Sequence, residues 1–125
     1  MTAGDEDLIR CVWDMVEANE SFQAALASSA ALMRESAVRL ENGGDLLDVV
    51  RTAPGGTGRD RVQRAEKVLT EARIRFRAHL VAACMAAGMS RREIASDMGF
   101  SPQLVSRYRK AAENGSDQPL KRAGS

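Results

Sequence analysis

Basic and acidic side chains are distributed unevenly along this chain of 125 residues, and charge is the first chemistry that they offer. Residues 1–58 contain four basic and ten acidic side chains, a net charge of −6. Residues 59–110 contain twelve basic and five acidic side chains, a net charge of +7. A basic half beside an acidic half is a cue for nucleic-acid contact, because lysine and arginine neutralise phosphates. Two solvated helix faces that differ, or that pair with each other, would give the same asymmetry, and charge alone does not separate the two interpretations.

Side chains that could perform catalysis or bind a metal are few. His79 is the single histidine, and with Cys11 and Cys84 it offers too few ligands for a metal site. The glycines at 55–58 lack a following lysine and a preceding strand, so they do not predict a phosphate-binding loop, and no nucleophile elbow or paired acid motif is present. We therefore expect no enzymatic activity, no metal and no cofactor. The cysteines form either a redox pair or, as we favour, two small buried side chains in a reducing cytoplasm.

The composition favours helices as the elements that position these side chains. Aromatic residues make up 4% of the chain, and Ala, Arg, Glu, Leu and Met, which are good helix formers, dominate. No stretch of about 18 uncharged apolar residues predicts a transmembrane helix. The acidic N-terminus is not typical of a secretory signal, so we expect a cytoplasmic protein without a membrane partner.

Two long helices are predicted by apolar residues at helical spacing, one over residues 5–41 and one over 59–87. In the first helix the apolar positions are Leu8, Val12, Met15 or Val16, Phe22, Leu26, Met33, Ala37 and Leu40. A break is possible at residues 27–30, and Asn42-Gly43-Gly44 ends the helix. A short helix over 45–51 and a flexible connection over 53–58, with three Gly and one Pro, lead to the second long helix.

Joined in this way, the two long helices form an antiparallel hairpin. A two-helix hairpin buries little surface by itself, so we expect it to dimerise or to pack on the C-terminal region. Trp13 and Phe22 are expected to anchor the core or the dimer seam.

Residues 90–112 carry a dense set of local folding signals. Ser90 and Glu93 form a capping box at the start of one short helix, and Gly99 permits the positive φ that a sharp turn requires. Ser101 caps the next helix, and Pro102 suits its first position. Ile94, Ala95, Met98, Phe100, Val105 and Tyr108 are the residues expected to pack the two helices together. Two short helices crossing over a turn are typical of a helix-turn-helix.

The run from Ala86 to Ser101, AAGMSRREIASDMGFS, resembles the run AG-S-x-x-E-I-A-x-x-x-G-x-S of bacterial repressors with a helix-turn-helix DNA-binding domain. It is also similar to the C-terminal modules of site-specific recombinases and sigma factors. Val105-Ser106-Arg107-Tyr108 continues the resemblance, which covers roughly residues 85–110. Pro102 departs from the polar residue common at its position and removes one candidate base contact.

The resemblance implies that the second helix enters the major groove of double-stranded DNA with its N-terminal residues at the base edges. Gln103 would then pair with adenine and Arg107 with guanine, while Arg91 and Arg92 would hold a phosphate. The full set of DNA-binding residues implied in this way is Ser90, Arg91, Arg92, Ser101, Pro102, Gln103, Ser106, Arg107, Arg109 and Lys110.

We therefore predict an all-α protein with a helical scaffold over 5–84 that bends at 42–58, a helix-turn-helix over 85–112 and a disordered tail over 113–125. Its expected function is that of a bacterial transcriptional regulator, such as a repressor, that binds a pseudo-palindromic site as a homodimer. The acidic N-terminal half would face away from the duplex or bind a protein partner. The alternative is a protein-interaction adaptor, such as a sigma-like or polymerase-binding module, without specific DNA binding.

Overall fold

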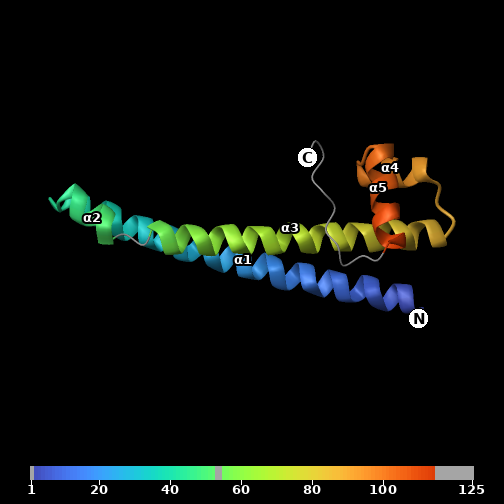
Figure 1. Ribbon diagram of the computed structural model, residues 1–125, viewed down its shortest axis with the longest axis horizontal. Helices are drawn as coiled ribbons and strands as arrows, with labels where there is room; N and C mark the ends of the chain where they lie inside the picture. Colours follow the sequence, from blue (N-terminus) through green and yellow to red (C-terminus); the bar gives the residue numbers. More distant parts are fainter. Residues whose placement is uncertain (1, 53–54, 115–125) are drawn as a thin grey trace. The chain divides into compact units, whose positions relative to one another are not determined.

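The computed structural model describes residues 2–52 and 55–114, and all its regular elements in these ranges are helices (Figure 1). They are α1 (Ala3–Glu41), α2 (Leu46–Thr52), α3 (Gly55–Ala86), α4 (Arg91–Met98) and α5 (Pro102–Glu113). The predicted all-α hairpin followed by a helix-turn-helix is confirmed, because α1 packs against α3 and α4 and α5 follow as the helix-turn-helix region. No described helix is both long and apolar enough to cross a bilayer.

The chain divides into two compact units, each of which takes one section of α1 and one of α3. The first, which we call the helix-turn-helix unit, contains the residues up to Val16 and those from Thr70 onward. The second, which we call the tip unit, is Glu17–Leu69 and includes α2.

Helix α1 runs without interruption across the predicted weak point at residues 27–30. Its start is fixed by Thr2 and Asp5, whose side chains each accept a hydrogen bond from the backbone amide of the other, at 3.1 Å and 3.2 Å. Its end is fixed as predicted by Gly43 at φ 84°, while a Cβ at Gly44 would come within 2.7 Å of the Arg39 carbonyl oxygen. Both ends are therefore set by contacts within a few residues.

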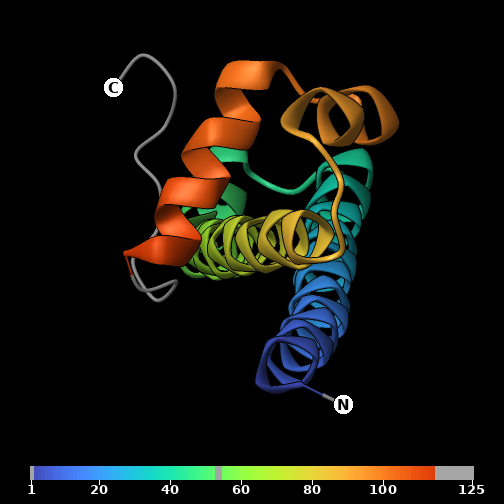
Figure 2. The same cartoon turned by 90° about the vertical axis from the view of Figure 1, so that its right-hand side faces the viewer.

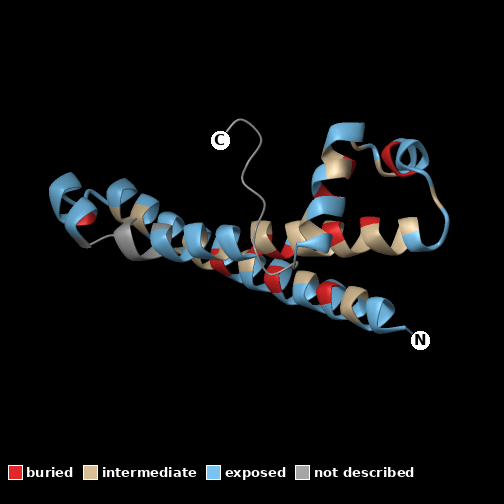
Figure 3. Cartoon of the chain, turned by 45° about the vertical axis from the view of Figure 1, so that its right-hand side comes forward, coloured by how far each residue is buried: buried red, intermediate tan, exposed pale blue. Residues whose placement is uncertain are grey.

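The buried positions of α1 recur every seven residues, at Cys11, Ala18 and Ala25. Figure 3 shows buried positions of α1 along its side toward α3, whereas the buried Ala78 and Val81 of α3 belong to the core with α4 and α5. Small side chains repeated at this interval allow two helices to approach closely along a coiled-coil-like seam. Two of the larger apolar residues whose spacing predicts this helix, Val12 and Leu26, are exposed and lie outside the seam.

The connection between the long helices is more helical than the sequence predicts. The short helix α2 covers Leu46–Thr52, close to the prediction, and buries Val49. Helix α3 begins at Gly55, four residues before the predicted start at 59, because glycine lowers helix propensity without forbidding the helix. Residues 53–54 of the predicted flexible connection lie outside the described residues.

Candidate nucleic-acid interface

The hydrophobic core of the helix-turn-helix unit is built from three helices. Helices α4 and α5 contribute Ile94, Ala95, Val105 and Tyr108, and α3 contributes Ala78 and Val81. Ile94, Val81 and Val105 are almost completely inaccessible to solvent. Figure 2 looks along α3 and shows α5 lying across its C-terminal section. The domain that presents α5 therefore includes part of α3, N-terminal to the stretch that carries the sequence resemblance.

Two opposite faces of α3 are apolar in this unit. Ile74, Ala78, Val81 and Met85 follow one another at helical spacing and belong to the core with α4 and α5. Ala72, which is buried, and Phe76 lie on the other side of the helix, which is available to α1. The section of α3 from 70 to 86 thus joins the hairpin to the helix-turn-helix.

The local signals that shape α4 and the turn are confirmed. The Ser90 hydroxyl accepts a hydrogen bond from the Glu93 amide, and the Glu93 carboxylate accepts one from the Ser90 amide, both at 3.1 Å. Hydrogen bonding of the Glu93 carboxylate to the Ser90 backbone above all, and then to the Ser90 side chain, lowers the pKa of Glu93 below its ordinary value. After Met98 the chain turns through Gly99 in the left-handed region, at φ 70° and ψ 26°. The capping box thus begins α4, and the left-handed Gly99 ends it where the turn must begin.

Helix α5 has a buried face and an exposed face on opposite sides. Ser101 caps its start by accepting a hydrogen bond from the Leu104 amide at 3.1 Å, and Pro102 takes the first turn. Val105 and Tyr108 are buried. Gln103, Arg107 and Lys110 are exposed, and their spacing of four and three residues places them on one face, away from the core. The local sequence thus directs one amide and two cations outward.

Arg91 at the start of α4 forms a hydrogen bond with a residue of α5 beside this exposed face. Its Nη1 donates to the Ser106 hydroxyl at 2.9 Å, and that hydroxyl donates to the Pro102 carbonyl oxygen at 3.1 Å. Arg91 and Ser106 line a shallow depression together with Arg107, Arg109, Lys110 and Glu113. A guanidinium has five N–H donors, so one bond to Ser106 leaves Arg91 able to bind an anion as well.

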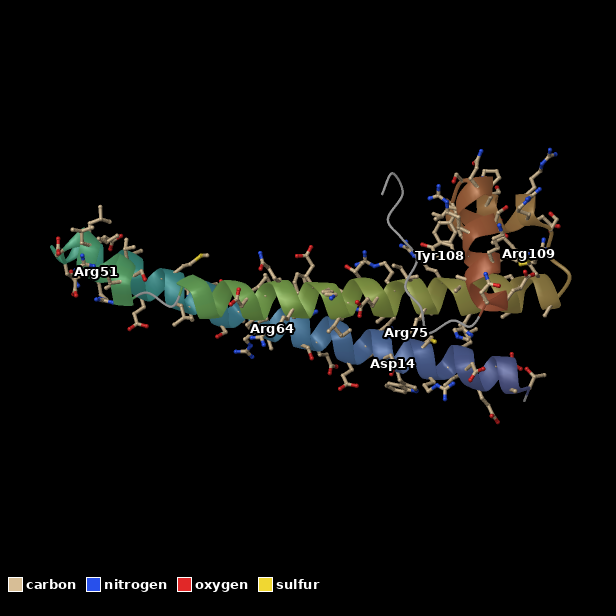
Figure 4. The ribbon with its side chains drawn as sticks, viewed as in Figure 1. Asp14, Arg51, Arg64, Arg75, Tyr108 and Arg109 are labelled. Carbon is tan, nitrogen blue, oxygen red and sulfur yellow. The ribbon has the colours of Figure 1, made fainter. Side chains whose placement is uncertain are left out.

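The remaining predicted residues are less alike in their surroundings. Arg92 is exposed in the first turn of α4. Arg109 forms an ion pair with Glu113 at 3.1 Å, and it projects from a different side of α5 than Tyr108 (Figure 4). Arg109 also lines a depression with Ala82 and Met85 of α3. Its side chain is therefore partly engaged within the domain.

Arg77 of α3 is a residue that the sequence does not identify. Its Nη1 donates to the Tyr108 hydroxyl at 3.3 Å, and its guanidinium carbon lies 5.2 Å from the centroid of the Phe100 ring. The Phe100 and Tyr108 rings are 5.6 Å apart at a tilt of 50°. Arg77 therefore links α3 to both the turn and α5. An apolar face at 74, 78, 81 and 85 is the one signal in the sequence that a further helix packs here, and it does not identify the arginine.

The surroundings of Cys11 do not favour a reactive thiolate. Both are free thiols, and Cys11 is buried. Burial raises the pKa of the Cys11 thiol, and the negative charge of Asp14 on α1 adds a smaller rise. The positive charge of Arg75 on α3 acts in the opposite direction and lowers that pKa (Figure 4). A raised pKa disfavours the thiolate that redox chemistry requires. Across residues 2–52 and 55–114, no three His, Cys, Asp or Glu side chains come together to hold a metal.

Trp13 does not anchor the core of this chain, since 67% of its surface is exposed, whereas Phe22 is partly buried. The residues predicted as a disordered tail begin with Glu113, which ends α5; of the rest, Asn114 is described and 115–125 lie outside the described residues.

Comparison with known proteins agrees with this geometry. Residues 71–121 match the family model of a homeodomain-like domain. The match begins within α3, as the three-helix core does. The chain thus contains a homeodomain-like helix-turn-helix domain, which suggests DNA as a partner. Comparison with curated proteins and with solved structures gives no match.

Proposed function

We propose that this protein is a sequence-specific DNA-binding transcriptional regulator that acts as a homodimer. The observation that carries the proposal is the exposed face of α5, where Gln103, Arg107 and Lys110 lie opposite the buried Val105 and Tyr108. In helix-turn-helix proteins the second helix of the motif enters the major groove, where arginine binds guanine and glutamine binds adenine.

Contacts to phosphate and to bases have different roles in this proposal. Arg91 and Arg92 lie at the start of α4, where cationic side chains and amides bind phosphate. Ser90 and Ser101 accept hydrogen bonds that cap α4 and α5, and Ser106 accepts one from Arg91. In this proposal the three serines hold the backbone in position and add contacts to phosphate. Pro102, Arg109 and Lys110 complete the surface that we propose to face DNA. In this proposal residues 85–112 contact the duplex and residues 5–84 form the scaffold.

The dimer contact is proposed at α2 in the tip unit. Leu46, Leu47 and Val50 expose 59–62% of their surface on a helix of seven residues. The charges beside them are of both signs, and include the ion pair between Arg39 and Asp48 at 3.6 Å. A mixed rim allows two copies of one surface to meet without like-charge repulsion, as a two-fold dimer requires. We expect Leu47→Glu to convert the dimer to a monomer in sedimentation; an unchanged mass would place the contact elsewhere.

Selection of duplexes from a random pool tests the DNA-binding function. We expect a symmetric motif whose half-sites lie about one helical turn apart, roughly 34 Å. We expect affinity to fall steeply with salt, because each neutralised phosphate releases counterions. An adaptor without specific DNA binding would select no motif, and that result would refute the proposal.

Two single variants test the separation of roles on the selected site. Arg107→Ala should weaken binding to that site by about 1–3 kcal/mol and relax the preference at one base pair. Arg92→Ala should weaken selected and scrambled duplexes alike, as expected for a phosphate contact. Equal effects of both variants on both duplexes would show that the assigned roles are wrong.

A further inference from the structure

Helix α1 carries apolar side chains on two opposite faces near its start. Cys11 is on the buried face, whereas Ile9, Val12, Trp13 and Val16 are 43, 42, 67 and 39% exposed. These four residues follow the spacing of a single helix face, and at about 100° per residue the centre of that face lies about 150° around the helix from Cys11. We call them the α1 outer patch. A helix packed on one partner is normally polar on its far side, so a second apolar face indicates a second partner.

The charges next to the α1 outer patch are almost all negative. Residues 1–20 contain six acids and one base, Arg10. Arg10 forms an ion pair with Asp7, which reduces the positive charge available to a partner. Asp5 and Glu6 precede the patch, and Glu17 and Glu20 follow it along the same helix. The apolar stripe therefore lies between acidic side chains at both of its ends.

The acidic side chains around the α1 outer patch indicate which kind of partner it binds: a second copy of the chain, a membrane surface or another protein. A second copy of the patch would bring acids against acids whether the two helices ran parallel or antiparallel, and like charges across an interface are unfavourable. An anionic membrane surface is disfavoured for the same reason, since interfacial helices use lysine and arginine. An apolar segment flanked by basic residues would match both the stripe and its ends.

We propose that the α1 outer patch docks a protein segment whose apolar face is flanked by lysine or arginine. The proposal specifies the protein partner that the sequence analysis gives as one expectation for the acidic N-terminal half, and its role at a site on DNA rests on the proposed function. Trp13 would be its central contact, because a large exposed aromatic side chain is the typical anchor of such an interface. Together with the DNA-binding α5 in the same unit, the patch would connect a bound site on DNA to another protein.

Trp13 is the single tryptophan of the chain, so its fluorescence reports directly on the patch. The probes are two synthetic amphipathic peptides of about 18 residues, or five helical turns. Both carry leucine at the spacing of the α1 outer patch and no aromatic residue. One has lysine beside the leucines, and the other has glutamate. We expect the lysine peptide to shift Trp13 emission to shorter wavelength and to bind about tenfold or more tightly than the glutamate peptide at low salt.

The double variant Val12→Ser/Val16→Ser removes apolar surface and keeps the reporter. It should weaken the lysine peptide about tenfold. The matched control is Val38→Ser, an exposed valine of α1 outside the patch, which should leave binding unchanged. Equal binding of both peptides, no shift of Trp13 emission, or an equal effect of the control variant would overturn the proposal.

Two further measurements test the rejected occupants. If the mass of the protein in sedimentation falls in the double variant, the patch contacts a second copy and the proposal is wrong. If vesicles of phosphatidylcholine and phosphatidylglycerol shift Trp13 emission as the lysine peptide does, the patch is a lipid surface and the proposal is again wrong. Duplex binding is measured on the same variants and should not change. If the unaltered protein does not bind the lysine peptide, this inference alone is contradicted, whereas failure to select a DNA motif contradicts the proposed function alone.

Discussion

Replacement of Arg77 by methionine should loosen α5 without unfolding the protein. Methionine keeps an unbranched apolar stem but removes the guanidinium from Tyr108 and Phe100. The hydrogen bond to Tyr108 is long, at 3.3 Å, and half-buried, so its contribution is about 1 kcal/mol. The cation–π contact at 5.2 Å contributes about 0.5–1 kcal/mol. The loss of both should therefore cost about 1.5 kcal/mol, which is roughly a tenfold change in an equilibrium constant.

Hydrogen exchange of the α4 and α5 amides measures this change locally. A chain with two compact units is not guaranteed to unfold in one step, so a single melting temperature would not isolate the effect. We expect Arg77→Met to raise exchange about tenfold in α4 and α5 and to leave the tip unit unchanged. The matched control is Arg73→Met, one turn earlier on α3 at an exposed position, which should have little effect.

Tyr108→Phe separates the two contacts of Arg77. It removes the hydroxyl and keeps the ring, so it should cost about 0.5–1 kcal/mol in the native background. In the Arg77→Met background it should cost less, because the bond is already absent. Full additivity of the two substitutions, or equal exchange in Arg77→Met and Arg73→Met, would refute the assignment of Arg77 as the link between α3 and α5.

Further predictions concern the turn, the cap and the core of the helix-turn-helix. Gly99→Ala should destabilise α4 and α5 by about 1–2 kcal/mol in hydrogen exchange. The cost comes from backbone strain at positive φ, because a Cβ at this position meets nothing within 4 Å. Gly99→Asn should cost less, since asparagine tolerates the left-handed region, and equal costs would show that backbone strain is not the cause. The lowered pKa of Glu93 means that its stabilisation is complete above the pKa of the unfolded chain, about 4.3, and is lost as the pH falls through the lower folded value. Glu93→Gln should remove that acid-dependent part of α4 protection, and an unchanged pH profile would show that the carboxylate is not its source. Ile94→Ala should destabilise the helix-turn-helix unit by about 2–5 kcal/mol in hydrogen exchange, compared with less than about 0.5 kcal/mol for the exposed Val68→Ala in its own unit.

The sequence predicts the helix-turn-helix to within a residue because its decisive interactions are local. Ser90 bonds Glu93, Ser101 bonds Leu104, and Gly99 alone supplies the left-handed turn, so each signal lies within about four residues. The ends of α1 at Gly43 and Gly44 are predictable for the same reason. Periodicity also predicts Val105 as buried, since the short α5 has one clearly apolar face.

The sequence by itself determined that the regular elements described are helices, where α1 ends and where α4 and α5 begin, and which side chains of α5 share a face. Only the tertiary structure decided which apolar face each long helix buries. The seam of α1 uses Cys11, Ala18 and Ala25 rather than larger neighbours, and α3 packs through opposite faces. The contacts of Arg77 with Tyr108 and of Arg91 with Ser106 join residues 31 and 15 positions apart. Helical periodicity shows that a face is apolar but not what covers it, because burial depends on residues that the chain brings together only after it folds.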